Sequence, residues 1–466
     1  MIASGKQPQK AEVQKLIADG YDFHCSRTFI LTLAEKHVHA ARAFIGKLVE
    51  QKWITYAADS RGDVSKLMER GGCATSIGFT YRGLKRLGLS GRRLEILQDK
   101  TKAFVEGAFH RASHRLADTG RSAAVLWDDL FKPDAAHVFL TIHGDSVNDL
   151  DRCQEALQAL SVDAFVPADL DERCIEGSHL ELTEQARKKR RVHFDFLDGI
   201  SKTAIKELST QSKTQGTVEH EPGEFLLGYR NDHGFNPWLL AADKPDIAEF
   251  FRNGSFGAFR QMEQDQIAFD EYLTTWSHKL EIDKSYLKAK FCGRWDDGSV
   301  VKPGKLPAPA DPNDFDFSDD PDGEGCPFGA HIRRMNPRKD PVVPFRSRPL
   351  IRRSMPYGPR FEKLPNEKRG LLGLFFCASL EDQFEHLLAE WGDSNPMGPN
   401  NRGNAKDPLI GNHEDPDAVF DIPVPGEIPC QLNGFKPFVT TRGTLYAFFP
   451  SRKALGMIAR LGEAGQ

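Results

Sequence analysis

The sequence of 466 residues lacks the cysteine patterns of a disulfide framework or a thiolate metal site. Its eight cysteines are scattered along the chain, and no two of them form a Cys-x-x-Cys pair. Disulfide-rich domains are usually short and dense in cysteine, whereas structural zinc sites need clustered ligands. We therefore expect reduced thiols.

A strong charge of one sign and a long apolar run are also missing. The formal net charge is only -4, and the pI is near 6.4, which argues against nucleic acid or an anionic membrane as the main partner. No stretch reaches the roughly 20 apolar residues of a membrane span. Residues 1–17 are polar and lack the apolar core of a secretory signal. These absences together predict a cytoplasmic protein.

A chain of this length exceeds the usual size of one hydrophobic core, so two domains or one duplicated domain is expected. Hydrophobic patterning predicts an α+β fold with antiparallel sheets, in which two comparable halves suggest a duplication. In the first half, strands are expected over 27–34, 54–58, 74–81 and 137–143, and helices around Leu84 and over 37–51, 94–117 and 147–160. In the second half, strands are expected over 255–261, 370–377 and 445–449, and helices over 266–279, 381–391 and 453–461.

The segment 326–338, CPFGAHIRRMNPR, contains one histidine and no second metal-ligand residue at ligand spacing. A lone imidazole cannot hold zinc, but it can hold haem iron from one side. From residue type alone, a histidine in such a loop is more often a hydrogen-bonded or solvated side chain than a ligand. Two irregular stretches, 301–322 and 395–415, read as surface loops, and the first could also wall a pocket beside His331.

Two further segments look ordinary when taken alone. In 194–201, FDFLDGIS, an Asp-Gly pair follows apolar residues, which is typical of a turn. In 348–359, RPLIRRSMPYGP, an arginine pair precedes a Pro-x-Gly-Pro turn, which is typical of a solvated face.

Taken together, these segments resemble the dye-decolorizing peroxidases, a haem family. The run Gly-Ala-His-Ile-Arg-Arg-x-Asn-Pro-Arg is similar to the family's proximal-histidine motif, and 194–201 is similar to its Gly-x-x-Asp-Gly signature. Other segments extend the resemblance over both halves in the family's order: 77–84, 224–229, 253–261 and 442–451.

The resemblance implies a role for each matching residue. His331 would be the axial ligand of the iron, and Asp198 and Arg352 would be the catalytic acid-base and the cation on the opposite side of the haem. Gly199, Ile200 and Ser201 would line the cofactor site. Glu381 is the best match for the carboxylate that hydrogen-bonds the histidine, although an acid stabilised at a helix N-terminus is an equally good interpretation.

The sequence departs from the signature at Asp195, which stands where the family has its first glycine. Aspartate resists a positive backbone angle, and it could add a second carboxylate near the pocket. The resemblance further implies two ferredoxin-like domains, dimeric α/β-barrel-like, over 1–205 and 206–466. The absence of a Cys-x-x-Cys-His motif implies non-covalent haem b, one per chain.

The predicted function is a haem-dependent peroxidase that reduces hydrogen peroxide and oxidises phenolic or dye-like aromatic substrates in one-electron steps. Peroxide cleavage requires a proton to move between the two oxygens while charge on the leaving oxygen is stabilised. A carboxylate and an arginine can do this. The alternative is a haem-binding protein of low turnover for storage, sensing or iron handling, if Asp195 misplaces Asp198.

Overall fold

The computed structural model describes residues 7–65, 71–181, 190–201, 203–210, 217–238, 245–304, 312–342, 347–394, 404–424, 426 and 428–462. Most strands join one antiparallel sheet of eight strands in the order β4-β1-β3-β2-β12-β7-β9-β8. These eight strands are β1 (Cys25–Leu31), β2 (Ala74–Phe79), β3 (Val138–Gly144), β4 (Cys174–Ser178), β7 (Ser255–Gln264), β8 (Ile351–Tyr357), β9 (Gly370–Cys377) and β12 (Val439–Phe449).

The sheet consists of two copies of one arrangement. In the first half the chain runs β1, helix α2, β2, β3, helix α8 and β4, and the strands lie in the order β4-β1-β3-β2. In the second half β7, β8, β9 and β12 lie in the order β12-β7-β9-β8, which is the same order when strands are counted from the start of each half. This is the ferredoxin-like βαββαβ topology, so the predicted α+β fold class is confirmed.

The two halves meet where β2 pairs with β12, at Phe79 and Phe448. The other two ends of the sheet approach each other without pairing: at Gly177 in β4, an added Cβ atom would lie 2.8 Å from the Met355 side chain of β8. Among the described residues, the sheet is therefore not closed into a barrel by hydrogen bonds.

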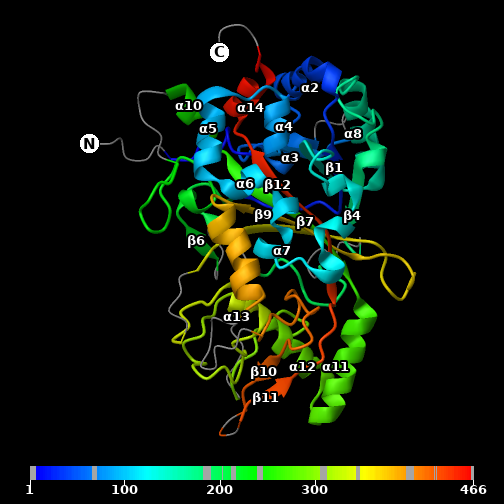
Figure 1. The fold of residues 1–466 in the computed structure, drawn as a ribbon, viewed down its shortest axis with the longest axis vertical. Coiled ribbons are helices and arrows are strands. Elements are labelled where there is room, and N and C mark those ends of the chain that lie inside the picture. The colour runs from blue at the N-terminus through cyan, green and yellow to red at the C-terminus, as the bar shows by residue number, and fades with distance from the viewer. Residues whose placement is uncertain are drawn as a thin grey trace.

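Helices cover the sheet at one end, and a smaller lobe lies at the other end. In Figure 1, α2, α4 and α14 lie at the top, whereas α11, α12 and the small β10–β11 sheet lie at the bottom. The α-helices are α1 (Lys15–Ala18), α2 (Val38–Glu50), α3 (Arg61–Ser65), α4 (Tyr81–Arg86), α5 (Gly91–Lys100), α6 (Lys102–Glu106), α7 (Ala108–Arg115), α8 (Val147–Leu160), α10 (Pro245–Phe251), α11 (Gln266–Leu280), α12 (Lys284–Cys292), α13 (His331–Met335) and α14 (Arg452–Ala459). Two π-helical turns span Leu380–Glu385 and Leu387–Gly392. The short strands are β5 (Thr203–Ile205), β6 (Val218–His220), β10 (Phe420–Ile422) and β11 (Cys430–Leu432).

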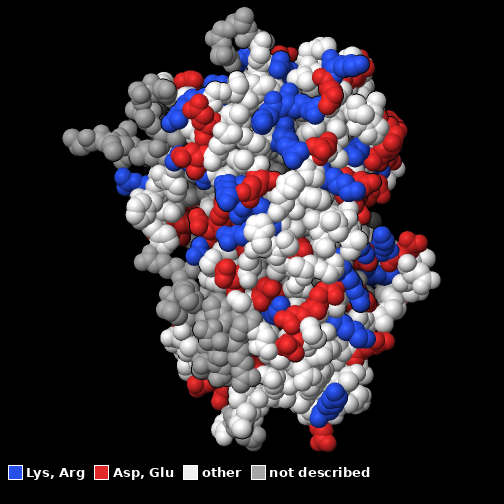
Figure 2. All heavy atoms as spheres, in the orientation of Figure 1, with Lys and Arg blue, Asp and Glu red and all other residues white. Residues whose placement is uncertain are grey.

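The surface carries both signs of charge. On the face shown in Figure 2, Lys and Arg lie interspersed with Asp and Glu, in keeping with the small net charge. None of the helices that the structure describes is long and apolar enough to cross a membrane.

Two expectations about local structure were wrong, and one strand was not expected. Residues 54–58 form no strand, since Tyr56 makes only an isolated bridge with Gln14. The helix expected over 94–117 is divided into α5, α6 and α7 because Thr101 and Gly107 leave the helical conformation, the latter with φ of 79°. The edge strand β8 was missed because its arginine pair and Pro356 look like a loop, although an edge strand tolerates proline.

The predicted domain boundary at 205/206 stays a prediction. The parallel pair of β5 and β6 straddles this position, with Ile205 opposite His220.

Candidate active site

A cavity of about 410 Å³ lies on one face of the second half of the sheet. This volume falls within the range of small-molecule and cofactor pockets, roughly 300–1,000 Å³. Its floor is made by residues of four adjacent strands, and its walls come from the segments around 198, 331 and 410. His331, Asp198 and Arg352 all line it, so the fold brings together three residues that are far apart in the sequence.

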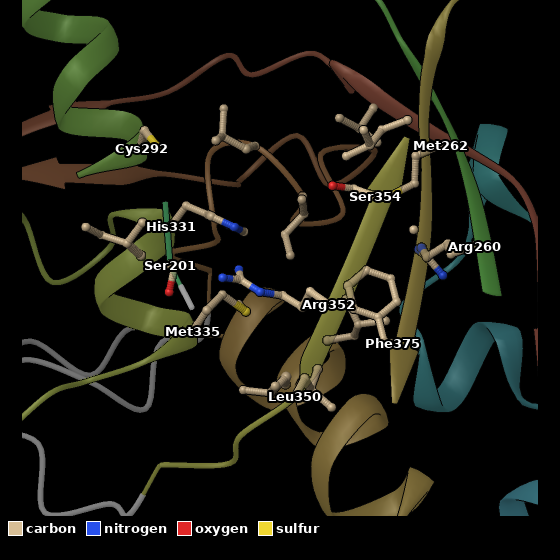
Figure 3. Close-up of a pocket in the computed structure, with 18 of the residues that line it drawn as sticks. Ser201, Arg260, Met262, Cys292, His331, Met335, Leu350, Arg352, Ser354 and Phe375 are labelled. Carbon is tan, nitrogen blue, oxygen red and sulfur yellow. The ribbon is translucent and has the colours of Figure 1, made fainter. Parts of the chain in front are cut away.

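His331 begins α13 and projects into the cavity (Figure 3). Its Nδ1 donates a hydrogen bond of 2.8 Å to Oδ2 of Asp407, whose side chain is fully buried. The second carboxylate oxygen, Oδ1, accepts from the backbone N–H groups of Leu409 and Ile410. This arrangement fixes the imidazole ring and leaves Nε2 as the nitrogen available to an iron.

The electrostatics of Asp407 favour its charged form. Burial by itself would raise the pKa of this carboxyl, but the charge and hydrogen bond of His331 and the charge of Arg334 outweigh burial and hold the pKa below its ordinary value. Asp407 therefore remains an anion beside the imidazole. A carboxylate in this position increases the electron donation of an imidazole to a metal.

Buried arginines hold the histidine segment in place. Arg334 is fully buried and donates to the carbonyls of Gly329, Trp391 and Ala405, at 2.7 to 2.9 Å. Arg333, also fully buried, donates to the carboxylate of Asp340 at 2.6 Å. Burial lowers the pKa of Arg334 to about 10. These bonds satisfy carbonyl groups that loops would otherwise leave unpaired in the interior.

Arg352 reaches the cavity from β8, on the side opposite α13 (Figure 3). Water in the cavity can reach its side chain, but protein surrounds it, and this desolvation lowers its pKa while the charge of Asp198 opposes the shift. Arginine starts from such a high pKa that the group stays cationic.

Asp198 is half-buried and is oriented by two hydrogen bonds. Its Oδ2 accepts from the hydroxyl of Ser354, two residues after Arg352 on β8, at 2.8 Å. Its Oδ1 accepts from the backbone N–H of Gly199 at 2.7 Å. Gly199, Ile200 and Ser201 also line the cavity. Ser354, which the sequence left without a role, thus connects the aspartate segment to the arginine strand.

Asp195 takes the conformation that glycine would favour. Its φ is 63°, a left-handed conformation that aspartate tolerates better than most residues. Its side chain is 55% exposed and lies 3.8 Å from the guanidinium of Arg360. Asp195 borders a separate, smaller pocket and does not line the cavity of His331. It therefore adds no second carboxylate beside Asp198.

The predicted partner of His331 was wrong. Glu381 accepts a hydrogen bond of 2.5 Å from the backbone N–H of Ala103 and does not line the cavity. Its place at the start of a helical segment matches the alternative interpretation of an N-terminal acid. Asp407 holds His331 instead. It lies within the irregular stretch 395–415, and nothing in the local sequence distinguishes it from a turn residue.

Both irregular stretches contribute to the walls. Phe315 from 301–322 and Leu409 to Glu414 from 395–415 line the cavity. Parts of each stretch, 305–311 and 395–403, lie outside the described residues.

The residues present fit a haem group. Among the described residues, no cluster of three or more His, Cys, Asp or Glu is suited to a bare metal ion. The cavity instead offers the imidazole of His331, which Asp407 orients, a cation facing it, and apolar walls that include Met335, Leu350 and Phe375 (Figure 3). A single axial imidazole and an apolar, largely enclosed pocket are what a haem iron requires.

Comparisons with known proteins agree with this geometry. A dye-decolorizing peroxidase of Mycetinis scorodonius is 28% identical over 423 residues, covering 82% of this chain and 75% of the relative. A dye-decolorizing peroxidase of Exidia glandulosa is 29% identical over 410 residues, with the same coverage. No model of a known protein family matches the chain.

Solved structures similar to this chain are also dye-decolorizing peroxidases. An ancestral D-type dye-decolorizing peroxidase superimposes with a TM-score of 0.77 at 26% identity, covering 96% of this chain and 99% of the other. A dye-decolorizing peroxidase in complex with 2,6-dimethoxyphenol has a TM-score of 0.77 at 24% identity, covering 97% and 99%. The fold is thus that of the dye-decolorizing peroxidases, and the named relatives support a peroxidase, an oxidoreductase. The relatives and the structural neighbours of the chain are dye-decolorizing peroxidases, which supports the family suspected from the motifs.

Proposed function

We propose that the protein is a haem-dependent peroxidase that reduces hydrogen peroxide and oxidises phenolic or dye-like aromatic compounds. The observation that carries the proposal is one cavity in which an imidazole held by Asp407 faces Arg352 and Asp198, in a chain whose relatives are dye-decolorizing peroxidases. A relative solved with 2,6-dimethoxyphenol supports phenols as the reductants.

In this proposal the haem is haem b, one per chain and without covalent links. His331 would bind the iron through Nε2, and Gly199, Ile200 and Ser201 would lie against the ring. Bound haem would supply the iron that takes up peroxide and exchanges electrons with it. The Asp407 carboxylate would keep the imidazole oriented and electron-rich.

The other residues would manage protons and charge. Asp198, oriented by Ser354, would take a proton from one oxygen of hydrogen peroxide and deliver it to the other. Arg352 would stabilise the negative charge that develops on the departing oxygen. In total, hydrogen peroxide gains two electrons and two protons and leaves as two waters. Each of two phenol molecules loses one electron and one proton.

The experiment is peroxidase turnover by haem-loaded protein with 2,6-dimethoxyphenol as reductant. We expect Asp198→Asn and Arg352→Leu to keep their haem and to lose turnover by about 10²-fold or more, the usual size of an acid-base or charge-stabilising contribution. Asp195→Asn is the matched control, because it makes the same change three residues away and outside the cavity. Full haem loading without turnover in the unmodified protein would favour the alternative of haem storage or sensing. The cytoplasmic location remains a prediction.

A further inference from the structure

The cavity has two polar ends that differ in charge. The basic end is lined by Ser201, Thr203, His220, Arg338 and Arg348. The acidic end is lined by Asp118, Ser122, Asn412, Glu414 and Thr441. In Figure 3, Ser201 and Arg260, which binds Asp118, lie on opposite sides of the cavity. The two ends therefore contact different parts of any molecule that fills the cavity.

Hydrogen bonds join the segments of the basic end. Arg338 Nη2 donates to Ser201 Oγ at 3.5 Å. The strand β5, which begins two residues after Ser201, pairs with β6, which ends at His220. The Gln383 amide then donates to carbonyls of the turn that follows β6 and of Pro349, at 3.0 and 2.7 Å. The fold thus brings His220 to the same end of the cavity as the arginine segments.

His220 is a second imidazole in the cavity that a carboxylate holds. Its Nδ1 lies 2.5 Å from Oδ2 of Asp232. Asp232 is itself fixed, because its Oδ1 accepts from the backbone N–H of Glu221 at 2.7 Å and its own N–H donates to Glu224 at 3.0 Å.

The other ring nitrogen of His220 is free to bind a ligand. His220 is only 8% exposed, and it lines the cavity. Its Nε2 makes no hydrogen bond with any residue that the structure describes, and it is not among the buried atoms that lack accessible surface. A group within the cavity can therefore reach this nitrogen.

Charge distinguishes the two ends. Arg338 and Arg348 line the basic end, where Arg348 donates to a backbone carbonyl and forms no ion pair with any described residue. At the acidic end, Arg260 is bound by the buried carboxylate of Asp118 at 2.6 and 2.7 Å, so its charge is neutralised. Glu414 adds a further carboxylate there. An anionic group is therefore attracted to the basic end and repelled from the acidic end.

Haem has the complementary distribution of charge. Its two carboxylates lie on one edge, and the rest of its rim is apolar. Burying a carboxylate is costly unless cations or hydrogen-bond donors pair with it. The middle of the cavity offers apolar side chains such as Leu350 and Phe375, whereas the basic end offers donors and positive charge.

We propose that haem lies in the cavity with its carboxylates at the basic end, and that His220, oriented by Asp232, binds one of them through Nε2. The proposal rests on the proposed function, because it requires a bound haem. A carboxylate on each side of the ring favours the imidazolium, which donates from both nitrogens. Arg338 and Arg348 add positive charge at the same end. His220 is thus a cofactor-recognition residue outside the three sequence motifs.

The test compares haem with haem dimethyl ester, in which both carboxylates are neutral. Ferric protein is loaded with either cofactor, and its transfer to excess apomyoglobin is followed. His220→Leu should release haem about 10- to 100-fold faster, the usual value of a hydrogen bond to a charged group. It should release the ester at the rate of the unmodified protein. Asp232→Asn should act in the same direction, since it removes the charge that holds the imidazolium.

Glu414→Gln is the matched control at the acidic end and should change neither release rate. If this variant held haem, but not the ester, more tightly, the carboxylates would lie at the acidic end and the proposal would be wrong. Equal acceleration for haem and ester in His220→Leu would also overturn it, because a merely structural effect acts on both cofactors. So would unchanged release of haem.

The experiment separates this site from the proposed function because it uses no peroxide. Release that depends on the carboxylates, in a protein without peroxidase turnover, would refute the proposed function alone. Peroxidase turnover in a protein whose His220→Leu variant releases haem and ester alike would refute this site alone.

Discussion

Replacing Asp407 by asparagine tests how the axial histidine is held. The substitution keeps the shape of the side chain but removes its charge. One amide oxygen then has to serve the three groups that now donate to the carboxylate: His331 Nδ1 at 2.8 Å, Leu409 N at 2.9 Å and Ile410 N at 3.1 Å. The amide NH₂ cannot accept any of them.

The expected loss is the value of the charged hydrogen bond to His331. Hydrogen bonds to charged groups are worth about 1.5–3 kcal/mol. The equivalent loss in cofactor affinity is about 10- to 100-fold, which is also the usual effect of changing a residue that orients a metal ligand. We therefore expect Asp407→Asn to release haem to apomyoglobin about 10- to 100-fold more readily, and its iron to have a higher reduction potential.

Glu381→Gln is the control for this experiment. Glu381 is also a half-buried acid in the second half of the chain, but it accepts a hydrogen bond from the backbone N–H of Ala103 and does not line the cavity. Its haem affinity should remain within about twofold of the unmodified protein. If Glu381→Gln released haem as readily as Asp407→Asn, or if Asp407→Asn were without effect, the assignment of Asp407 as the partner of His331 would be wrong.

The other predictions concern Ser354, Asp195 and His137. Ser354→Ala should keep haem but lower the rate of the peroxide step about ten-fold, because Asp198 loses the hydrogen bond that orients it; an unchanged stopped-flow rate would refute that role. Asp195→Gly should leave turnover equal and change the free energy of unfolding by less than about 1 kcal/mol. Glycine removes the strain of the left-handed backbone at position 195 in the folded state, but it also raises the conformational entropy of the unfolded chain, and the two effects oppose each other. A large loss of turnover would show that Asp195 acts in the cavity. Burial, with a smaller contribution from the charge of Arg86, lowers the pKa of His137 to about 4 in the folded protein. Between about pH 6.5 and pH 4 the His137 imidazole therefore takes up a proton in the unfolded chain but not in the folded one, and the folded protein loses stability as the pH falls through this range. In His137→Asn the slope of the unfolding free energy against pH, measured by denaturant unfolding, should be smaller by up to about 1.4 kcal/mol per pH unit. An unchanged slope would show that the pKa of His137 is not lowered in the folded protein.

Much of the fold was predictable because its signals are local. The helix expected over 147–160 and the strand expected over 370–377 coincide with α8 and β9, since α8 has a helical hydrophobic period and β9 is a short, uninterrupted apolar run. β8 was not predictable in this way. Its arginines face a cavity and a buried carbonyl cluster, so the strand lacks the apolar alternation that marks a half-buried strand.

The site residues also differ in whether the sequence predicts them. His331, Asp198 and Arg352 were found because each lies in a recognisable motif, and the fold brings all three to one cavity. Asp407 lies 76 residues after His331, and its role depends on a contact that only the folded chain creates.

The most direct test of the central claim is the iron–imidazole stretching band in the resonance Raman spectrum of the ferrous haem-loaded protein. His331→Gly should lose this band and recover it when free imidazole is added, whereas His413→Gln, which changes another imidazole lining the cavity, should retain it. A band that persists unchanged in His331→Gly without added imidazole would show that a different residue holds the iron.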